Sequence, residues 1–299
     1  MNTINNSLIF LGTGAAEAIP AFFCRCGYCE HARKHGGKDV RSRSAFRLNE
    51  NVHIDLGPDL FHQLVKTGLD VHDLTDVLIT HTHSDHLNFF EMLLKDCAVV
   101  TNGNKPVRIY VSETAYSWAT GMFRQCVLGD YANDEQGYKQ WQQRFPITAL
   151  PYYEPASIGG YTVTPLKGTH GGYGEGEIAA NYLITLPDRR IFYYASDTGY
   201  FFEETFTYLE KVKLDILVME CTFGGDESRG DYVKGHLDLK NFNLVLDRLL
   251  ANGTIDQGTK VYATHINHKH PLHHDQLQDA FDRTSPVSVI VAFDGMAIE

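Results

Sequence analysis

One short segment of the chain gathers four side chains that can bind metal ions. His81, His83, Asp85 and His86 fall within six residues, in an H-x-H-x-D-H pattern. They directly follow Asp76–Thr80, an apolar run that predicts a strand. Imidazole and carboxylate groups together suit zinc, manganese or iron. Because a rigid sheet can hold converging ligands in the loops beyond its strand ends, the segment predicts a metal centre.

Three further candidate ligands occupy the same kind of position later in the chain. His170, Asp197 and His265 each come immediately past an apolar run that predicts a strand. The four ligands of the first segment are too few to fill the coordination spheres of two cations. We therefore expect these three residues to complete the set at later strand ends.

Three of the six cysteines form a separate cluster. Cys24, Cys26 and Cys29 lie within six residues of one another. Cysteines this close seldom form disulfides with each other, and in a cytoplasmic chain such a cluster more often binds a metal. The cluster predicts a second metal site, distinct from the first.

The elements that must position these residues are short strands separated by turns, with a few helices between them. The helical patterns are Pro58–Thr67, Asp238–Ala251 and His273–Arg283. The expected strands are Ser7–Leu11, Phe46–Leu48, Val52–Leu56, Asp76–Thr80, Val107–Val111, Tyr161–Leu166, Asn181–Leu186, Ile191–Ala195, Asp215–Met219, Lys260–Thr264 and Val287–Phe293. This irregular alternation is typical of packed sheets covered by helices and not of a doubly wound parallel sheet.

The chain shows no internal repeat and no linker, so we expect a single domain over residues 1–299. An insertion rich in aromatic residues is expected at about 112–160. It could form a helical lid, an interface or a loop region that covers the core.

Charge and hydropathy exclude several classes of protein. The 26 basic and 37 acidic residues give a formal net charge of −11, and there is no basic run. Generic nucleic-acid binding is therefore disfavoured, because it depends on Lys and Arg displacing counterions. No apolar run approaches the roughly 18 residues that span a bilayer, and the N-terminus lacks a signal-peptide pattern. We expect a cytoplasmic protein with no membrane partner, and a homodimer stays open as its assembly.

The candidate ligand set resembles that of the dinuclear hydrolases of the metallo-β-lactamase superfamily. The stretches Leu11-Gly12-Thr13-Gly14, Ile54-Asp55-Leu56-Gly57 and Phe293-Asp294-Gly295-Met296 are also similar to that family. The resemblance implies an α+β fold, an αββα sandwich of two packed mixed sheets flanked by helices. It implies one cation at His81, His83 and His170, and a second cation at Asp85, His86 and His265. Asp197 would bridge the two cations, and Asp55 would support the ligands.

A narrower resemblance, to the carbon–phosphorus-lyase accessory phosphodiesterases, rests on Cys24-x-Cys26-x-x-Cys29 together with His268. It implies a structural zinc, and three thiolates with one imidazole make a closed tetrahedral site. The alternative fourth ligands are His270, His273 and His274. That subgroup also implies a catalytic role for His236, as general acid or phosphate contact, although a polar residue at a helix start is the alternative. We also expect Asp85 to take part in catalysis, in addition to binding a cation.

These resemblances imply a phosphodiesterase that uses two divalent cations, manganese or zinc with iron as a further candidate, and one structural zinc. A hydroxide bridging the cations would attack a small anionic phosphate diester, including a cyclic one. One alternative is a lactonase or thioesterase of the same fold. Another is a ribonuclease Z-like nuclease, although Met219 replaces the His of that branch's His-Glu-Ala-Thr motif and its basic arm is absent. The last is a non-catalytic cofactor-biosynthesis protein resembling the pyrroloquinoline-quinone B-type proteins.

Overall fold

The computed structural model describes residues 8–100, 103, 105–127, 134–270 and 272–298. Ser7 of the first expected strand and residues 128–133 of the aromatic-rich segment lie outside this part. The strands form two seven-stranded sheets. The first has the order β14 (Ala297–Ile298), β1 (Leu8–Gly12), β2 (Ala45–Arg47), β3 (Val52–Ile54), β4 (Asp76–Leu78), β5 (Arg108–Ser112) and β6 (Ile147–Leu150). The second has the order β13 (Val289–Val291), β12 (Lys260–Thr264), β11 (Ile216–Glu220), β10 (Ile191–Ala195), β9 (Ala180–Thr185), β8 (Tyr161–Lys167) and β7 (Ala156–Ile158).

Both sheets are mixed, and each contains a run of parallel strands. Strands β3 to β6 pair in parallel in the first sheet. Strands β10 to β13 pair in parallel in the second, while β7, β8, β9 and β10 pair antiparallel. Parallel neighbours bring their carboxyl ends to the same edge of a sheet, where ligands of open sheets usually bind.

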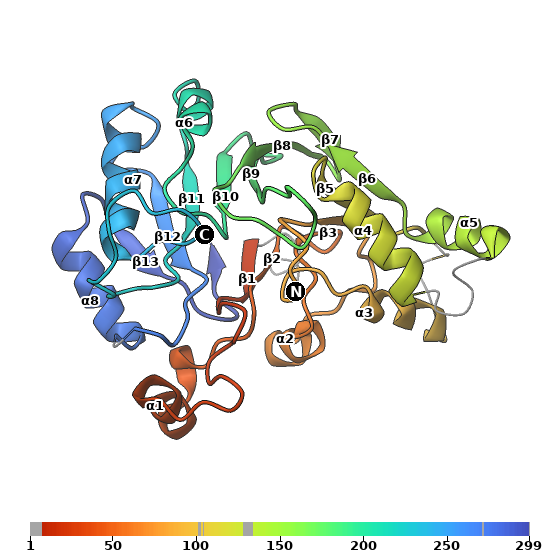
Figure 1. Ribbon diagram of the computed structural model, residues 1–299, viewed down its shortest axis with the longest axis horizontal. Coiled ribbons are helices and arrows are strands. Elements are labelled where there is room, and N and C mark those ends of the chain that lie inside the picture. Colours follow the sequence, from red (N-terminus) through yellow and green to blue (C-terminus); the bar gives the residue numbers. More distant parts are fainter. Residues whose placement is uncertain (1–7, 101–102, 104, 128–133, 271, 299) are drawn as a thin grey trace.

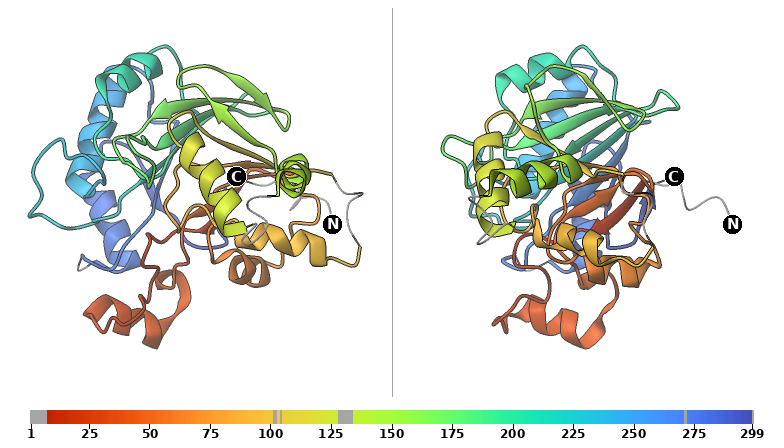
Figure 2. Two further views of the ribbon diagram at one scale, coloured as in Figure 1. Left: turned by 45° about the vertical axis from the view of Figure 1, so that its right-hand side comes forward. Right: turned by 90° about the vertical axis from the view of Figure 1, so that its right-hand side faces the viewer.

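Helices cover the outer faces of the sandwich (Figures 1 and 2). The helices are α1 (Gly27–His35), α2 (Leu60–Thr67), α3 (Phe90–Leu93), α4 (Tyr116–Met122), α5 (Glu135–Arg144), α6 (Glu203–Leu209), α7 (Leu239–Ala251) and α8 (His274–Thr284), with short 3₁₀ segments at Gly37–Asp39 and Leu94–Cys97 and a π turn at Phe123–Val127. Helix α1 projects below the sandwich in Figure 1 and does not cover a sheet face. Phe206, Phe242 and Phe281 pack the last three helices onto the second sheet. Leu60 and Ala119 pack α2 and α4 onto the first. None of the helices described is long and apolar enough to cross a membrane.

The central core lies between the two sheets, and alternation along the strands builds it. In β10, Phe192 and Tyr194 belong to the layer between the sheets, whereas Tyr193 belongs to the layer under the helices. The rings of Phe46 and Phe192, one from each sheet, stack at 5.4 Å. Successive strand residues point to opposite faces, so apolar runs without polar alternation are buried on both sides. The expected α+β fold, an αββα sandwich, is confirmed.

Each of the eleven expected strands overlaps an observed one, and the structure adds β6, β7 and β14. Strands β6 and β7 both lie in the aromatic-rich segment and form the outermost strand of the first and the second sheet, respectively. Helices α4 and α5 come from the same segment. Residues 112–160 therefore contribute an edge to each sheet in addition to helices on the outer face.

The two glycine-containing stretches near the chain ends meet in the structure. The buried carboxylate of Asp294 accepts hydrogen bonds from the backbone N–H groups of Thr13 (3.0 Å) and Ser42 (2.7 Å) and from both hydroxyls. A Cβ atom at Gly12 would lie 2.0 Å from the carbonyl oxygen of Arg43, so only glycine fits there. These contacts fix the start of the long loop that carries the cysteine cluster.

Candidate metal centre

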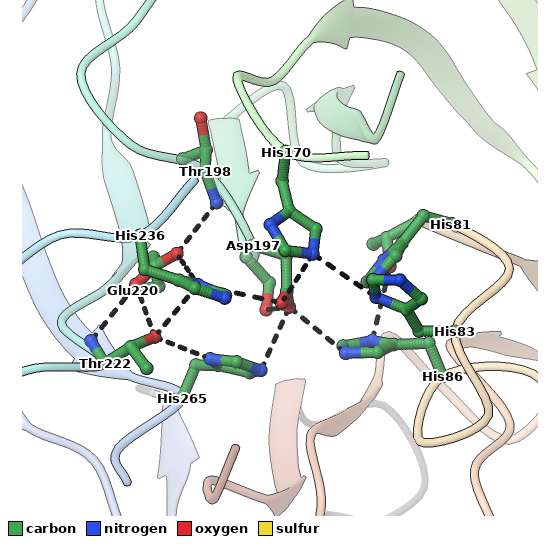
Figure 3. A network of polar contacts seen from close by, with 12 residues as sticks. His81, His83, His86, His170, Asp197, Thr198, Glu220, Thr222, His236 and His265 are labelled. Carbon is green, nitrogen blue, oxygen red and sulfur yellow. Dashed lines mark hydrogen bonds and ion pairs between the residues drawn. The ribbon is translucent and has the colours of Figure 1, made fainter. Parts of the chain in front are cut away.

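The seven candidate ligands of the first site come together at one edge of the sandwich, and Figure 3 labels all of them except Asp85. Each follows the carboxyl end of a strand: His81, His83, Asp85 and His86 follow β4, His170 follows β8, Asp197 follows β10 and His265 follows β12. The expectation that strand ends bring these residues together therefore agrees with the geometry.

Three imidazoles form the first part of the cluster. Nε2 of His81 lies 2.9 Å from Nδ1 of His83. The same Nδ1 lies 3.3 Å from Nε2 of His170. Three ring nitrogens thus converge on one point, which is the arrangement that three imidazole ligands of one cation require.

A carboxylate-rich part lies directly beside them. Nε2 of His86 is 3.0 Å from Oδ2 of Asp85 and 3.1 Å from Oδ2 of Asp197. Oδ2 of Asp197 is also 3.1 Å from Nε2 of His265. The other oxygen of Asp197, Oδ1, lies 3.9 Å from Nε2 of His170. Asp197 therefore stands between the two parts, where a bridging carboxylate would stand.

Hydrogen bonds on the far side of two rings set their tautomers. Nδ1 of His86 donates to Asp55 (2.7 Å), and Nδ1 of His81 donates to the hydroxyl of Thr80 (3.1 Å), which itself donates to Asp55. With the proton on Nδ1, each ring presents the lone pair of Nε2 to the centre. Such support by a carboxylate or hydroxyl is typical of histidines that bind metals.

The imidazole and carboxylate donors of this cluster fit divalent cations. Among the described residues, Nε2 of His86 and Nε2 of His265 are fully buried and lie 3.0–3.1 Å from carboxylate oxygens, but without the geometry of a hydrogen bond. A buried polar atom without a partner costs about 1–3 kcal/mol. Burial alone would raise the pKa of Asp197, but His265 and His86 hold the pKa of this carboxyl well below its usual range. Ionised carboxylates facing imidazole nitrogens that no hydrogen bond satisfies are a set that divalent cations would satisfy.

Backbone strain is concentrated at the same place. Asp55, Asp197 and His265 have φ angles of 64°, 53° and 57°. A left-handed backbone costs a residue with a side chain about 1–3 kcal/mol and persists where the surrounding structure imposes it, commonly at functional sites. This strain supports a functional role for the edge where the three residues lie.

His236 joins the cluster through Glu220, which ends strand β11. Nδ1 of His236 lies 2.7 Å from Oε1 of Glu220, whose buried carboxylate also accepts from the N–H groups of Thr198 (2.8 Å) and Leu237 (3.1 Å). Although burial works in the opposite direction, Glu220 raises the pKa of His236 to about 9. The ring points towards Asp197, between His170 and His265 (Figure 3). Glu220 itself was not expected from the sequence, although it comes one residue after the expected apolar strand Asp215–Met219 and is the last residue of β11.

The cysteine cluster lies away from this edge and has its own histidine. Nδ1 of His268 is 3.5 Å from Sγ of Cys24 and 3.4 Å from Sγ of Cys26. Cys29 completes a group whose candidate ligand atoms all lie within 4.8 Å of one another. Burial raises the pKa of the Cys29 thiol to about 12, so a cation beside it is needed to ionise it at neutral pH. The set fits a closed tetrahedral zinc site.

The three alternative histidines make other contacts. Nδ1 of His270 accepts the N–H of Leu272 (3.2 Å). His273 caps the start of α8, and Nδ1 of His274 lies 2.9 Å from the guanidinium of Arg41. Among these candidates, the geometry therefore favours His268 as the fourth ligand.

Comparison with known proteins decides the family. The family model described as a beta-lactamase superfamily domain matches residues 50–266, which is most of the chain and includes the whole histidine and aspartate cluster. The chain belongs to the metallo-β-lactamase superfamily. This superfamily's hydrolase fold implies divalent metal ions, and the clusters described above are the residues that could bind them.

Other relatives of this superfamily show the same fold at low identity. A diphosphatase from the PhnP family has 20% identity and a TM-score of 0.67, over 98% of this chain and 96% of that one. Zinc-bound PqqB from Methylobacterium extorquens has 16% identity and a TM-score of 0.72, over 98% and 99%. Ribonuclease Z of Crocosphaera subtropica is 31% identical over 81 residues, which are 25% of this chain and 26% of the enzyme. The resemblance to the superfamily is confirmed, and a PhnP-family structure is among those that share its fold.

Proposed function

We propose that this protein is a metal-dependent phosphodiesterase that hydrolyses a small phosphate diester, including a cyclic one. The observation that carries the proposal is the His236–Glu220 pair, set at 2.7 Å beside the two groups of candidate ligands. A ligand cluster alone suits many hydrolases. A separate histidine that faces a buried carboxylate next to the cluster adds a candidate for the acid that an alkoxide leaving group needs.

The proposed ligands divide as the distances suggest. His81, His83 and His170 would hold one cation, Asp85, His86 and His265 would hold the other, and Asp197 would contact both. When bound, two divalent cations, manganese, zinc or iron, supply Lewis-acid stabilisation of the phosphoryl oxygens and lower the pKa of water. Asp85 acts in this proposal by fixing His86 and by contributing a carboxylate at the reacting edge.

The chain's own residues supply the rest of the chemistry. Asp55 and Thr80 keep the lone pairs of His86 and His81 directed at the centre. Glu220 holds Nδ1 of His236, which leaves the proton on Nε2 free to reach the leaving oxygen. Glu220 is therefore a positioning residue, and His236 is the proposed general acid.

Charge favours a phosphate ester over a lactone or thioester. Phosphoryl transfer spreads negative charge over three equatorial oxygens, so it gains most from a concentrated positive site. Two bound cations would create such a site in a protein whose formal net charge is −11. The similarity to a diphosphatase of the PhnP family also supports a phosphate ester as the substrate.

A nuclease like ribonuclease Z is the second candidate, because 81 residues are 31% identical to such an enzyme. Two features of the sequence count against it. The acidic chain lacks a basic run that would hold RNA phosphates. In its Met-Glu-Cys-Thr stretch, Met219 stands where the ribonuclease Z motif has a His. We therefore place the small diester first and test the nuclease directly.

A side-by-side assay tests the proposal. Metal-loaded protein is offered bis-p-nitrophenyl phosphate, a lactone, a thioester and a precursor tRNA, and His62→Ala serves as a control because His62 is exposed on α2. We expect turnover of the diester by wild type and His62→Ala, and little turnover of the other three. Preferred cleavage of the lactone, the thioester or the tRNA would replace the proposed function with that activity, and no turnover of any substrate would favour a cofactor-biosynthesis role.

We also propose that Cys24, Cys26, Cys29 and His268 hold a structural zinc. Four protein ligands leave no open coordination position for a substrate. The zinc would join the long loop after β1 to the loop after β12. Cysteine clusters that bind zinc are typical of a reducing compartment, which supports the cytoplasm as the protein's location.

A further inference from the structure

The loop that follows His170 presents a large aromatic side chain beside the candidate metal centre. The ring centroid of Tyr173 lies 4.8 Å from that of His83, with the planes at 68°. On another side, the indole of Trp118 from α4 lies 5.3 Å from the Tyr173 ring. Despite these two contacts, Tyr173 remains 53% exposed. A large aromatic surface thus stays open to solvent next to a proposed ligand.

The backbone that carries Tyr173 is tied to the metal-binding segment. The N–H of Tyr173 donates to the hydroxyl of Thr82 (2.9 Å), which lies between His81 and His83. The buried carboxylate of Glu177 accepts from the N–H of Thr82 (2.8 Å) and from the N–H of Gly174 (2.8 Å), and it also accepts from the Thr82 hydroxyl. Tyr173 therefore has a fixed position relative to the ligands.

The glycines of this loop serve close packing. A Cβ atom at Gly172 would lie 2.2 Å from the carboxylate of Glu177. A Cβ atom at Gly174 would lie 2.9 Å from the same carboxylate and 3.3 Å from Cβ of Trp118. The loop can approach Glu177 and α4 this closely only without side chains. An exposed ring on a backbone held in this way loses little conformational entropy when a ligand stacks on it.

We infer that Tyr173, backed by Trp118, is a stacking platform for a planar aromatic group of the substrate. Aromatic side chains can stack on any nucleobase, and each stacked base contributes binding energy. This inference rests on the proposed phosphodiesterase function and narrows its substrate to diesters in which one alcohol is a nucleoside. It also gives the aromatic-rich segment, through Trp118, a part in substrate selection.

Two diesters with one leaving group test the platform. Thymidine 5′-(p-nitrophenyl phosphate) and methyl p-nitrophenyl phosphate both release p-nitrophenolate, so they differ in the retained alcohol alone. We expect Tyr173→Leu to raise KM for the thymidine diester about 5- to 20-fold with little change in kcat, and to leave the methyl diester within about 2-fold. Tyr173→Phe keeps the ring and should behave as wild type. Equal losses on both substrates, or no loss on either, would overturn the platform.

A binding measurement separates this inference from the proposed function. The chain has two tryptophans, so Trp141→Phe leaves Trp118 as the only fluorescent indole beside Tyr173. In that background we expect thymidine 5′-monophosphate to change Trp118 emission, with affinity about 5- to 20-fold weaker after Tyr173→Leu. Ribose 5-phosphate should bind both proteins equally. If neither diester is hydrolysed while this difference holds, the phosphodiesterase assignment fails and the platform stands; if the nucleotide binds both proteins alike, the platform fails.

Discussion

Nδ1 of His236 lies 2.7 Å from Oε1 of Glu220, and the two residues are 16 positions apart in the chain. The Glu220 carboxylate is fully buried, and backbone N–H groups of Thr198 and Leu237 fix its orientation. A buried carboxylate held in this way favours the protonated form of the histidine that faces it. The pair thus provides a proton donor beside the candidate metal ligands.

His236→Ala should slow an alkyl or cyclic nucleotide diester much more than it slows bis-p-nitrophenyl phosphate. An alkoxide leaves poorly unless it is protonated as the bond breaks, whereas p-nitrophenolate leaves without help. General acid catalysis is typically worth about 10²–10⁴ in rate. The measurement is kcat for both substrates, with wild type assayed alongside.

Glu220→Gln is the companion variant, because it preserves the shape of the side chain and removes its charge. We expect Glu220→Gln also to slow the alkyl or cyclic nucleotide diester more than bis-p-nitrophenyl phosphate. The loss in rate should be smaller than for His236→Ala. Equal losses on the two substrates in both variants would instead assign His236 to phosphate binding or to metal coordination, since it also lies close to His170 and Asp197.

His83→Ala and Asp197→Ala should each abolish diester turnover while leaving folded protein with its cysteine-site zinc. These side chains contribute cation affinity and chemistry, whereas the core depends on packing between the sheets and the helices. Activity, circular dichroism and zinc content are measured together, with His62→Ala as the matched control. Near wild-type rates in both variants would rule out the proposed ligands.

Cys26→Ser should lower the zinc content by about one ion per chain and reduce the melting temperature. A structural zinc contributes directly to the free energy of folding, whereas activity per folded molecule should persist. The matched control is Cys97→Ser, because Cys97 is exposed outside the cluster. Loss of turnover at unchanged stability would place the cysteine cluster in the chemistry instead.

Because of the buried His53, the folded protein should become less stable in acid. Its ring is fully buried in β3 and neither nitrogen makes a hydrogen bond in the described part of the chain; burial and the nearby Arg47 lower the pKa of His53 to about 3. Between pH 6.5 and 3 the unfolded chain binds a proton that the folded chain does not, so stability falls as pH falls. From pH 7.5 to pH 5 this linkage costs about 2 kcal/mol.

Urea unfolding of wild type and His53→Leu at the two pH values measures this contribution. The variant should lose about 2 kcal/mol less than wild type between pH 7.5 and pH 5, because leucine does not titrate. His62→Leu, at an exposed position, should lose as much as wild type. An identical loss in wild type and His53→Leu would show that His53 is not protonated on unfolding.

The candidate ligands could be predicted because each depends on local order in the chain. His81, Asp197 and His265 all follow apolar strands, and the carboxyl ends of neighbouring parallel strands meet at one edge. Strands β6 and β7 were missed because they are short edge strands with partly exposed residues, so their sequences lack a strong apolar pattern.

The positioning residues could not be predicted, because their roles arise from contacts between distant segments. Glu220 is defined by its contact with His236, and Glu177 is defined by hydrogen bonds to Thr82, 95 positions earlier. The contact between Trp118 and Tyr173 likewise depends on how α4 packs against the loop after His170. Composition placed Trp118 in an aromatic-rich segment but could not place it beside the site.

The most direct test of the central claim is anomalous diffraction from crystals of zinc-loaded protein, with data collected on both sides of the zinc absorption edge. The account predicts two peaks flanking Asp197, one towards His81, His83 and His170 and one towards Asp85, His86 and His265. It predicts a third peak enclosed by Cys24, Cys26, Cys29 and His268. Absence of any peak within the histidine and aspartate cluster, or a single one there, would contradict a two-cation hydrolytic centre.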